Sequence, residues 1–340
     1  MKKVYHLSHT DLDGYSCQLI TDRVFKDIEF FNSNYGDEIT QRLTQIVGSI
    51  KEDGFSENLI LITDLNLTLE DATFLEESIK GIDQDVEILL LDHHKSGEEV
   101  AKKYSWYHLD VNRSATKITY DWFKSSGLID ELSEYVECVN AYDIWLVEQE
   151  KRFEIGKVLA RYVMSAKEIN RIMFSEDSFK YIKSMIEEGV KYIGREDAHI
   201  ALDDNLHSIK KKFFIQHENN TLENLVSEYV VELLTKNKEF MSVYYKGSRG
   251  ILTYSVGNSS IIGNGFLVKN PDFDFFMDIN SRKNISLRAN NKIDVSLLAK
   301  EVFDGGGHAN ASGGRFGEFK DSFVYEDIKK QIEEKFLEFS

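Results

Sequence analysis

The sequence predicts an α/β protein with an N-terminal doubly wound parallel sheet, a helical connector and a smaller C-terminal α+β domain. In the first part of the chain, short apolar runs alternate with segments of helical spacing, which is typical of βαβ units. After about residue 240, polar and apolar residues alternate, which indicates strands with one exposed face. The 340 residues exceed one typical core, so the length also favours about two domains.

The N-terminal elements follow from the spacing of apolar residues. Apolar runs predict strands at residues 1–8, 27–32, 58–63, 86–91 and 106–111. Helical spacing predicts helices at residues 15–26, 39–50, 68–80 and 114–126. Ser114 is a candidate N-cap of the last of these helices. The acidic residues that follow Thr68 suit the positive end of a helix dipole.

The rest of the chain divides into a helical block and a strand-rich block. Residues 129–238 are helical in pattern almost throughout, with helices predicted at 169–193, 198–214 and 222–234. After them we expect strands at 241–245, 250–254, 273–279 and 285–288, and helices at 295–303 and 325–339. The expected boundaries are 1–195 for the parallel-sheet domain, 196–238 for the connector and 239–340 for the C-terminal domain.

Composition and charge argue against several classes of protein. No apolar run reaches the roughly 18 residues of a membrane-spanning helix, and the N-terminus lacks a signal-peptide core, so we expect a cytoplasmic protein without a membrane partner. The formal net charge of −17 disfavours binding to a long nucleic-acid duplex, because basic residues supply most of that affinity. Cys17 and Cys138 are too few for a disulfide framework and are expected to be buried thiols.

Acidic residues and histidines gather where the predicted strands end. The carboxyl ends of parallel strands meet at one edge of a sheet, where such proteins build their sites. Carboxylate and imidazole ligands suit Mn, Fe, Zn or Mg. One tetrahedral ion needs about four ligands, so a larger set fits two ions that share a carboxylate better. The candidate ligands are His9, Asp11, Asp13, Asp64, His93 and Asp143.

Each of these residues also has an ordinary structural interpretation. Asp64 alone is compatible with a helix N-cap, and Asp143 alone with a surface acid. The triplet Asp92-His93-His94 is compatible with a polar loop. We favour the metal site because these independent interpretations would all have to coincide at strand ends.

Two motifs carry a resemblance to a known family. Asp92-His93-His94 after an apolar run, with Asp11-x-Asp13-Gly14 upstream, resembles the DHH phosphoesterases. The stretch 305–314, Gly-Gly-Gly-His-Ala-Asn-Ala-Ser-Gly-Gly, resembles the glycine-rich signature of the DHH-associated domain. The two halves occur in the family's order and cover most of the chain. The chain is most similar to the oligoribonuclease, or nanoRNase, branch.

The resemblance implies a two-metal site, with Mn²⁺ expected and Mg²⁺ or Co²⁺ as alternatives. One ion would take His9, Asp11 and Asp64. The other would take Asp13, Asp64, His93 and Asp143, which makes Asp64 the bridging ligand. The spacing His9-x-Asp11 is shorter than is usual in the family, so His9 is either a ligand or a residue that orients one.

The resemblance also assigns the remaining polar residues. His94 is expected to face the scissile phosphate and stabilise its charge, and Asp92 to orient a ligand histidine. In the C-terminal domain, the expected contacts to the non-reacting end of the substrate are Arg288, Gly305, Gly306, Gly307, His308 and Ser312. Taken alone, the glycine triplet is a flexible turn and Arg288 an exposed strand arginine.

We therefore expect a phosphoesterase, a hydrolase of ester bonds, that cleaves short oligonucleotides or small nucleotides by two-metal activation of water. The alternatives within the family are a single-strand exonuclease, a cyclic dinucleotide phosphodiesterase, a 3′-phosphoadenosine phosphatase and a pyrophosphatase. A nucleotide sensor that retains the metals is the non-enzymatic alternative. A homodimer is compatible with the sequence, which does not decide the oligomeric state.

Overall fold

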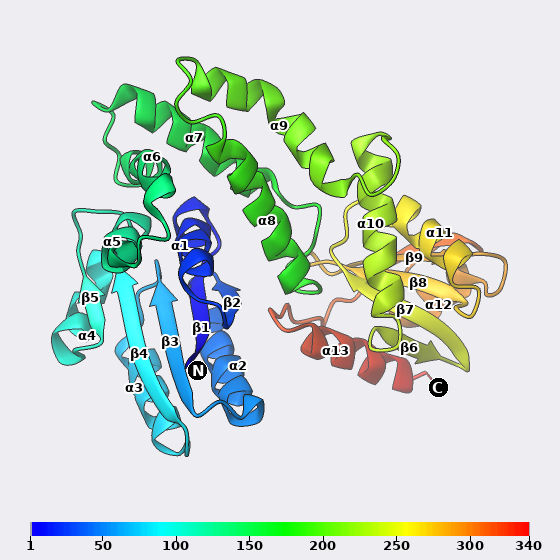
Figure 1. Cartoon of the computed structure of the whole chain (residues 1–340). Coiled ribbons are helices and arrows are strands. Elements are labelled where there is room, and N and C mark those ends of the chain that lie inside the picture. The colour runs from blue at the N-terminus through cyan, green and yellow to red at the C-terminus, as the bar shows by residue number, and fades with distance from the viewer. Residues whose placement is uncertain (1, 340) are drawn as a thin grey trace. The chain divides into compact units, whose positions relative to one another are not determined.

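The computed structural model describes residues 2–339 and divides into two compact units (Figure 1). The first unit comprises the chain up to Ala166 together with Phe179–Ile209. The second comprises Lys167–Ser178 and the chain from Lys210 onward. The expected domain boundaries after residues 195 and 238 stay a prediction.

The first unit is built on a five-stranded parallel sheet with the order β2-β1-β3-β4-β5. Its strands are β1 (Lys2–His9), β2 (Ile28–Ser33), β3 (Glu57–Thr63), β4 (Asp85–Asp92) and β5 (Tyr107–Leu109). The strands β2 and β3 are the two neighbours of β1, one on each side of it in the sheet. This reversal of strand order between β1 and β3 is the point where ligands bind in open α/β sheets.

Helices cover both faces of this sheet, namely α1 (Leu12–Val24), α2 (Asp37–Asp53), α3 (Leu69–Lys80), α4 (Glu98–Lys103) and α5 (Ala115–Phe123). Two further helices, α6 (Ser133–Asp143) and α7 (Glu150–Ser165), pack on α1 and on each other. Apolar residues of α2 and α3 pack on one face, where Leu43, Ile46 and Leu75 join the buried core of the sheet. On the other face α1 packs against β1 and α5. The doubly wound arrangement predicted from the sequence is confirmed.

The second unit contains a six-stranded mixed sheet with the order β10-β11-β9-β8-β7-β6. Its strands are β6 (Ser242–Tyr245), β7 (Ser248–Tyr254), β8 (Phe275–Ile279), β9 (Asn284–Ala289), β10 (Gly306–His308) and β11 (Ala311–Arg315). Its helices are α10 (Leu222–Lys236), α11 (Ser259–Lys269), α12 (Val295–Phe303) and α13 (Tyr325–Leu337). Side chains of α12 and α13 close its main apolar core.

Two helices, α8 (Ser175–Val190) and α9 (Ala198–Phe214), run from one unit into the other. The predicted bounds of α9 and α12 agree with the structure, and the expected fold class is confirmed. Only the part of predicted helix 169–193 that forms α8 is a regular helix. The helix α11 was not predicted, because its glycines lower helix propensity and packing on the sheet decides its conformation. No helix within residues 2–339 has the length and hydropathy needed to cross a membrane.

The tight turn after β1 makes a test of the fold possible. A Cβ atom on Gly14 would lie 2.4 Å from the backbone oxygen of His9, whereas one on Gly48 in α2 would meet no atom within 4 Å. Gly14→Ala should therefore lower the free energy of unfolding by about 1–3 kcal/mol, because the added methyl group would clash with the His9 carbonyl. Gly48→Ala should raise it by roughly 0.5–1 kcal/mol through helix propensity.

Urea unfolding measures the free energy of unfolding of both variants. Because both substitutions remove the same backbone freedom from the unfolded chain, the difference between them reports the close contact at Gly14. Equal effects of the two substitutions would contradict the close approach of α1 to the end of β1.

Candidate metal centre

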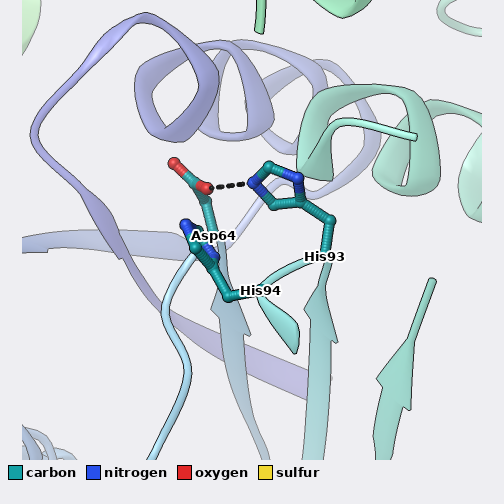
Figure 2. A group of neighbouring side chains, drawn as sticks. All are labelled: Asp64, His93 and His94. Atoms are coloured by element: carbon teal, nitrogen blue, oxygen red, sulfur yellow. Dashed lines mark ion pairs between the residues drawn. The ribbon is translucent and has the colours of Figure 1, made fainter. Parts of the chain in front are cut away.

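The candidate ligands converge at the carboxyl end of the parallel sheet in the first unit. His9 ends β1, Asp64 follows β3, and His93 and His94 follow β4. Figure 2 shows the His93 ring turned towards Asp64, with 3.3 Å between His93 Nε2 and Asp64 Oδ1. Asp143 reaches the same region from the end of α6. The topology therefore brings four distant segments of the chain together.

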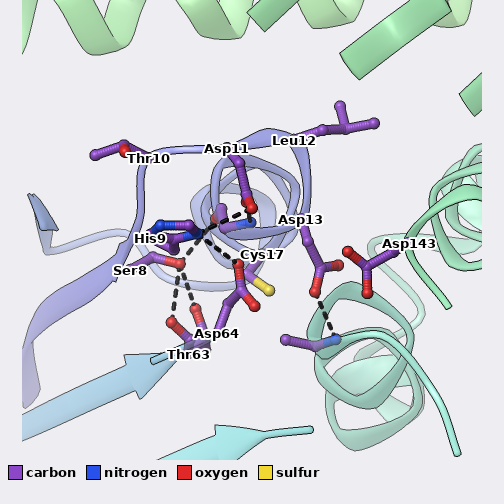
Figure 3. Close-up of polar contacts among 12 residues, drawn as sticks. Ser8, His9, Thr10, Asp11, Leu12, Asp13, Cys17, Thr63, Asp64 and Asp143 are labelled. Atoms are coloured by element: carbon purple, nitrogen blue, oxygen red, sulfur yellow. Dashed lines mark hydrogen bonds and ion pairs between the residues drawn. The ribbon is translucent and has the colours of Figure 1, made fainter. Parts of the chain in front are cut away.

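The end of β1 and the start of α1 form the first part of the site (Figure 3). Asp11 is the N-cap of α1, and its Oδ1 accepts a hydrogen bond from the Gly14 N–H at 3.1 Å. Its Oδ2 lies 2.9 Å from His9 Nδ1. Burial alone would lower the pKa of His9, but hydrogen bonds and charges from Asp11 and Asp64 outweigh it and raise the pKa to about 10. Partial desolvation would raise the pKa of Asp11, but the hydrogen bond and charge of His9 outweigh it and lower the pKa to about 2.

Asp64 occupies the centre of the site and is held in a rare conformation. It follows the central strand β3, is 2% exposed and has a φ of 56°, in the left-handed region. Its N–H donates to the Leu91 carbonyl at 3.2 Å, which ties it to β4. Its Oδ2 is buried without a hydrogen-bond partner. Burial, followed by the charges of Asp13 and Asp11, raises the pKa of Asp64 well above its usual range.

Asp13 is fixed by the N-terminus of α5. Its two carboxylate oxygens accept hydrogen bonds from the N–H groups of Ala115 at 2.7 Å and Thr116 at 2.9 Å. A helix N-terminus stabilises negative charge, so this carboxylate is both oriented and partly compensated. His93 Nε2 lies 3.7 Å from Asp13 Oδ2, which places the imidazole between Asp13 and Asp64.

Asp143 completes the arrangement beside His93. Its Oδ2 lies 3.6 Å from His93 Nδ1, beyond hydrogen-bond length, and is buried without a partner. Burial, followed by the charge of Asp13, raises the pKa of Asp143 to about 8. Asp143 and Asp64 therefore each present a buried oxygen that lacks a hydrogen-bond partner among the described residues and has only an imidazole nitrogen 3.6–3.7 Å away.

Three groups in this region have ligand atoms within 4.8 Å of one another. They are His9-Asp11-Asp64, Asp13-His93-Asp143 and Asp64-His93-His94. The first is one of the two ligand sets expected from the sequence. The second contains three of the four residues expected for the other ion and lacks Asp64, and the third group joins Asp64 to His93. Hard carboxylate oxygens with imidazole nitrogens fit Mn²⁺, Fe²⁺, Zn²⁺ or Mg²⁺. Divalent cations would also offset the repulsion that raises the pKa values of Asp64 and Asp143.

His94 is held by a pair of buried groups. Asp92 Oδ1 lies 2.7 Å from His94 Nδ1, and Asp92 Oδ2 accepts a hydrogen bond from the Tyr107 hydroxyl at 2.5 Å. Asp92 is fully buried, while about a third of the His94 side chain is exposed. The carboxylate that was expected to orient a ligand histidine therefore contacts His94, and no contact between it and His93 is found among the described residues.

Sequence reasoning did not identify two sets of residues that support the site. Beneath Asp64, the Thr63 hydroxyl lies 2.8 Å from both His6 Nε2 and Ser8 Oγ. Burial lowers the pKa of His6 to about 3, so the ring is neutral. Above the site, the Tyr35 hydroxyl lies 3.1 Å from His94 Nε2. Tyr35 could have been found from its position just after β2, because the other residues of the site also follow strands.

The residues expected to bind substrate lie together at one edge of the sheet in the second unit. The glycine-rich stretch forms the hairpin of β10 and β11, in which Gly307 pairs with Ser312 and His308 with Ala311. Gly306 and His308 are exposed on the edge strand, and the Ser312 hydroxyl donates to the His308 carbonyl at 2.8 Å. The N–H of Gly305 donates to the Ala299 carbonyl at 2.9 Å and so is not available to an anion.

Arg288 lies on β9, opposite Ala311 of β11. Its guanidinium donates to the Ser260 hydroxyl and to the Leu287 carbonyl, each at 2.7 Å. The glycines alone suggested a flexible turn, but the structure shows a hairpin. A Cβ on Gly305 or Gly314 would overlap neighbouring backbone atoms, so the close packing of this hairpin depends on glycine at these positions.

Comparison with known proteins gives one close relative over the whole chain. The chain is 44% identical over 346 residues to the 3′,5′-cyclic-nucleotide phosphodiesterase of Helicobacter pylori, and the match covers 99% of both proteins. The crystal structure of an uncharacterized protein from Helicobacter pylori G27 matches with a TM-score of 0.94 and 43% identity, covering 99% of this chain and 100% of that chain. No protein-family model matches the sequence. The similarity extends over both units.

The raised pKa of Asp143 predicts how stability depends on pH in the metal-free protein. Between its usual pKa of 3.8 and about 8, the folded state binds more protons than the unfolded state, so this group makes stability fall as pH rises through that window. Asp143→Asn should remove the effect, and its gain over the natural protein should grow to roughly 1–3 kcal/mol near pH 8. Urea unfolding from pH 5 to 8, with a chelator present, measures this gain.

The exposed acid Asp83 provides the control, since Asp83→Asn makes the same change in net charge away from the site. A gain for Asp143→Asn that does not change with pH, or that matches the control, would contradict the uncompensated buried carboxylate.

Proposed function

The chain belongs to the same phosphodiesterase family as the Helicobacter pylori 3′,5′-cyclic-nucleotide phosphodiesterase, and we propose that it is a metal-dependent phosphoesterase of the DHH type that hydrolyses a nucleotide phosphodiester. It is an enzyme that acts on ester bonds. The proposed reaction breaks the bond between phosphorus and a ribose oxygen and releases a nucleoside monophosphate. We expect it to act in the cytoplasm, without a membrane or long-duplex partner.

One observation carries the proposal. Two adjacent groups of carboxylates and imidazoles converge on Asp64 and His93, and two of their buried oxygens have no hydrogen-bond partner. Leaving buried charges uncompensated is strongly destabilising, so the arrangement is explained if cations belong there. We propose that His9, Asp11 and Asp64 hold one divalent cation and that Asp13, Asp64, His93 and Asp143 hold a second. Mn²⁺ is our first candidate, with Mg²⁺ and Co²⁺ next.

Bound in this way, a pair of divalent cations lowers the pKa of a water molecule and neutralises the phosphoryl group. The protein's own residues prepare the site for this. The N–H groups at the start of α5 orient Asp13, and the Gly14 N–H orients Asp11. Asp92 fixes the ring of His94, whose exposed side can donate to a phosphoryl oxygen.

Two substrate classes follow from different observations. The name of the Helicobacter pylori relative favours a 3′,5′-cyclic nucleotide, a class the sequence did not suggest. The DHH-type motifs favour short linear oligonucleotides instead. Both substrates contain a phosphodiester at a ribose 3′ oxygen, and the net charge of −17 suits a small anion better than a long polyanion. In either case we propose that Arg288, His308, Ser312 and Gly306–Gly307 hold the non-reacting end.

Metal removal tests the proposed function directly. Purified protein that has been stripped with a chelator should lose hydrolysis of a 3′,5′-cyclic nucleotide, and about two equivalents of Mn²⁺ should restore it. Asp64→Asn should lower kcat at least about 100-fold, since it weakens both proposed ion sites at once. Asp64→Asn should not disturb the left-handed backbone of residue 64, because Asn also tolerates that conformation.

A panel of a cyclic mononucleotide, a linear dinucleotide and a linear pentanucleotide ranks the two substrate classes by kcat/KM. Full activity after chelation, with metal content below one ion per chain, would overturn the metal-dependent mechanism. Binding of nucleotides without turnover of any of them would favour a sensor.

A further inference from the structure

Tyr35 stands between two histidines of the candidate metal centre. It follows β2 and precedes Gly36, which has a φ of 93°. Its ring lies against His9, with 5.2 Å between the ring centroids, and against His94, with 5.6 Å between them. Its hydroxyl lies 3.5 Å from the Asp64 carbonyl oxygen. Although it touches this buried site, 42% of Tyr35 is exposed, so a substrate can reach it.

The hydroxyl of Tyr35 is the outermost member of a hydrogen-bonded chain. The Tyr107 hydroxyl donates to Asp92, and Asp92 lies 2.7 Å from His94 Nδ1. The Tyr35 oxygen lies 3.1 Å from His94 Nε2 and 3.2 Å from Nδ1. Because Asp92 engages Nδ1, Nε2 is the nitrogen left to interact with Tyr35. A carboxylate, an imidazole and a hydroxyl in this order form a path along which a proton can be returned to the hydroxyl.

We propose that Tyr35 is a further catalytic residue, whose O–H donates a hydrogen bond and then its proton to the leaving oxygen of the substrate. The inference rests on the proposed function and adds to it the group that assists departure of the alcohol. A phenol hydroxyl is ordinarily protonated near neutral pH, so Tyr35 has a proton to donate. His94 keeps its proposed role at the phosphoryl oxygens, and its contact with the phenol also orients Tyr35.

The step balances in atoms and electrons. The oxygen of a water molecule forms a bond to phosphorus, and the bond from phosphorus to the ribose oxygen breaks with its electron pair going to that oxygen. The Tyr35 proton then completes the new alcohol. The proton that the attacking water loses returns through solvent and His94 to the Tyr35 oxygen, which regenerates the residue.

Dependence on the leaving group tests the proposal. Tyr35→Phe is compared with the natural protein on two substrates, namely the nucleotide that the panel above identifies and bis(p-nitrophenyl) phosphate. For the nucleotide, kcat should fall about 100-fold or more, because an alkoxide leaves poorly without a proton. For the nitrophenyl ester, kcat should change little, because p-nitrophenolate is a stable anion. Affinity for the nucleoside monophosphate product and the melting temperature should both be unchanged.

Tyr104→Phe is the matched control, since it removes a hydroxyl that contacts Thr73 at 3.2 Å away from the candidate ligands. The control should keep both activities. Equal losses of Tyr35→Phe on the two substrates would overturn the proposal and leave Tyr35 as a support for His94. Undiminished nucleotide hydrolysis by Tyr35→Phe would also overturn it. If the natural protein hydrolyses neither substrate with Mn²⁺ bound, the proposed function itself is what fails.

Discussion

The candidate site in the first unit depends on one constraint, the repulsion among four carboxylates that lie close together. Asp11, Asp13, Asp64 and Asp143 lie at one end of the parallel sheet, and the chain compensates only some of them. Asp11 has an imidazole partner and Asp13 has the N-terminus of α5. Asp64 and Asp143 have raised pKa values, and each has a buried oxygen without a hydrogen-bond partner among the described residues. Such a cluster adds nothing to stability by itself, which is why we propose that it binds cations.

The fold supplies this cluster through strand order and a few close approaches. Because β1 and β3 are neighbours in the sheet, the turns that follow them carry His9, Asp11 and Asp64 into one region. The absence of a side chain on Gly14 allows α1 to start against the end of β1. Asp64 turns sharply out of β3 with a left-handed backbone, a conformation that aspartate tolerates better than most residues. Rigid strand ends thus position the polar side chains.

The sequence predicted all the strands except β10 and β11, most helices and a set of candidate ligands, because these depend on local patterns and on which residues end apolar runs. It did not predict Tyr35 as part of the site, since its role depends on contacts with His94 and Asp64 that strand order creates. It also did not predict the β10 and β11 hairpin, because glycine-rich strands have weak intrinsic preference and pairing with β9 decides their conformation. Asp92 was expected to support a ligand histidine, but backbone geometry directs it to His94.

The central claim is that the carboxyl end of the parallel sheet binds two divalent cations, and anomalous X-ray scattering from crystals grown with Mn²⁺ tests it most directly. We expect two manganese peaks in each chain, one contacting Asp11 and Asp64 and the other contacting Asp13, His93 and Asp143. A single peak elsewhere, or fully occupied water molecules in hydrogen bonds with Asp64 Oδ2 and Asp143 Oδ2, would rule out the two-cation site.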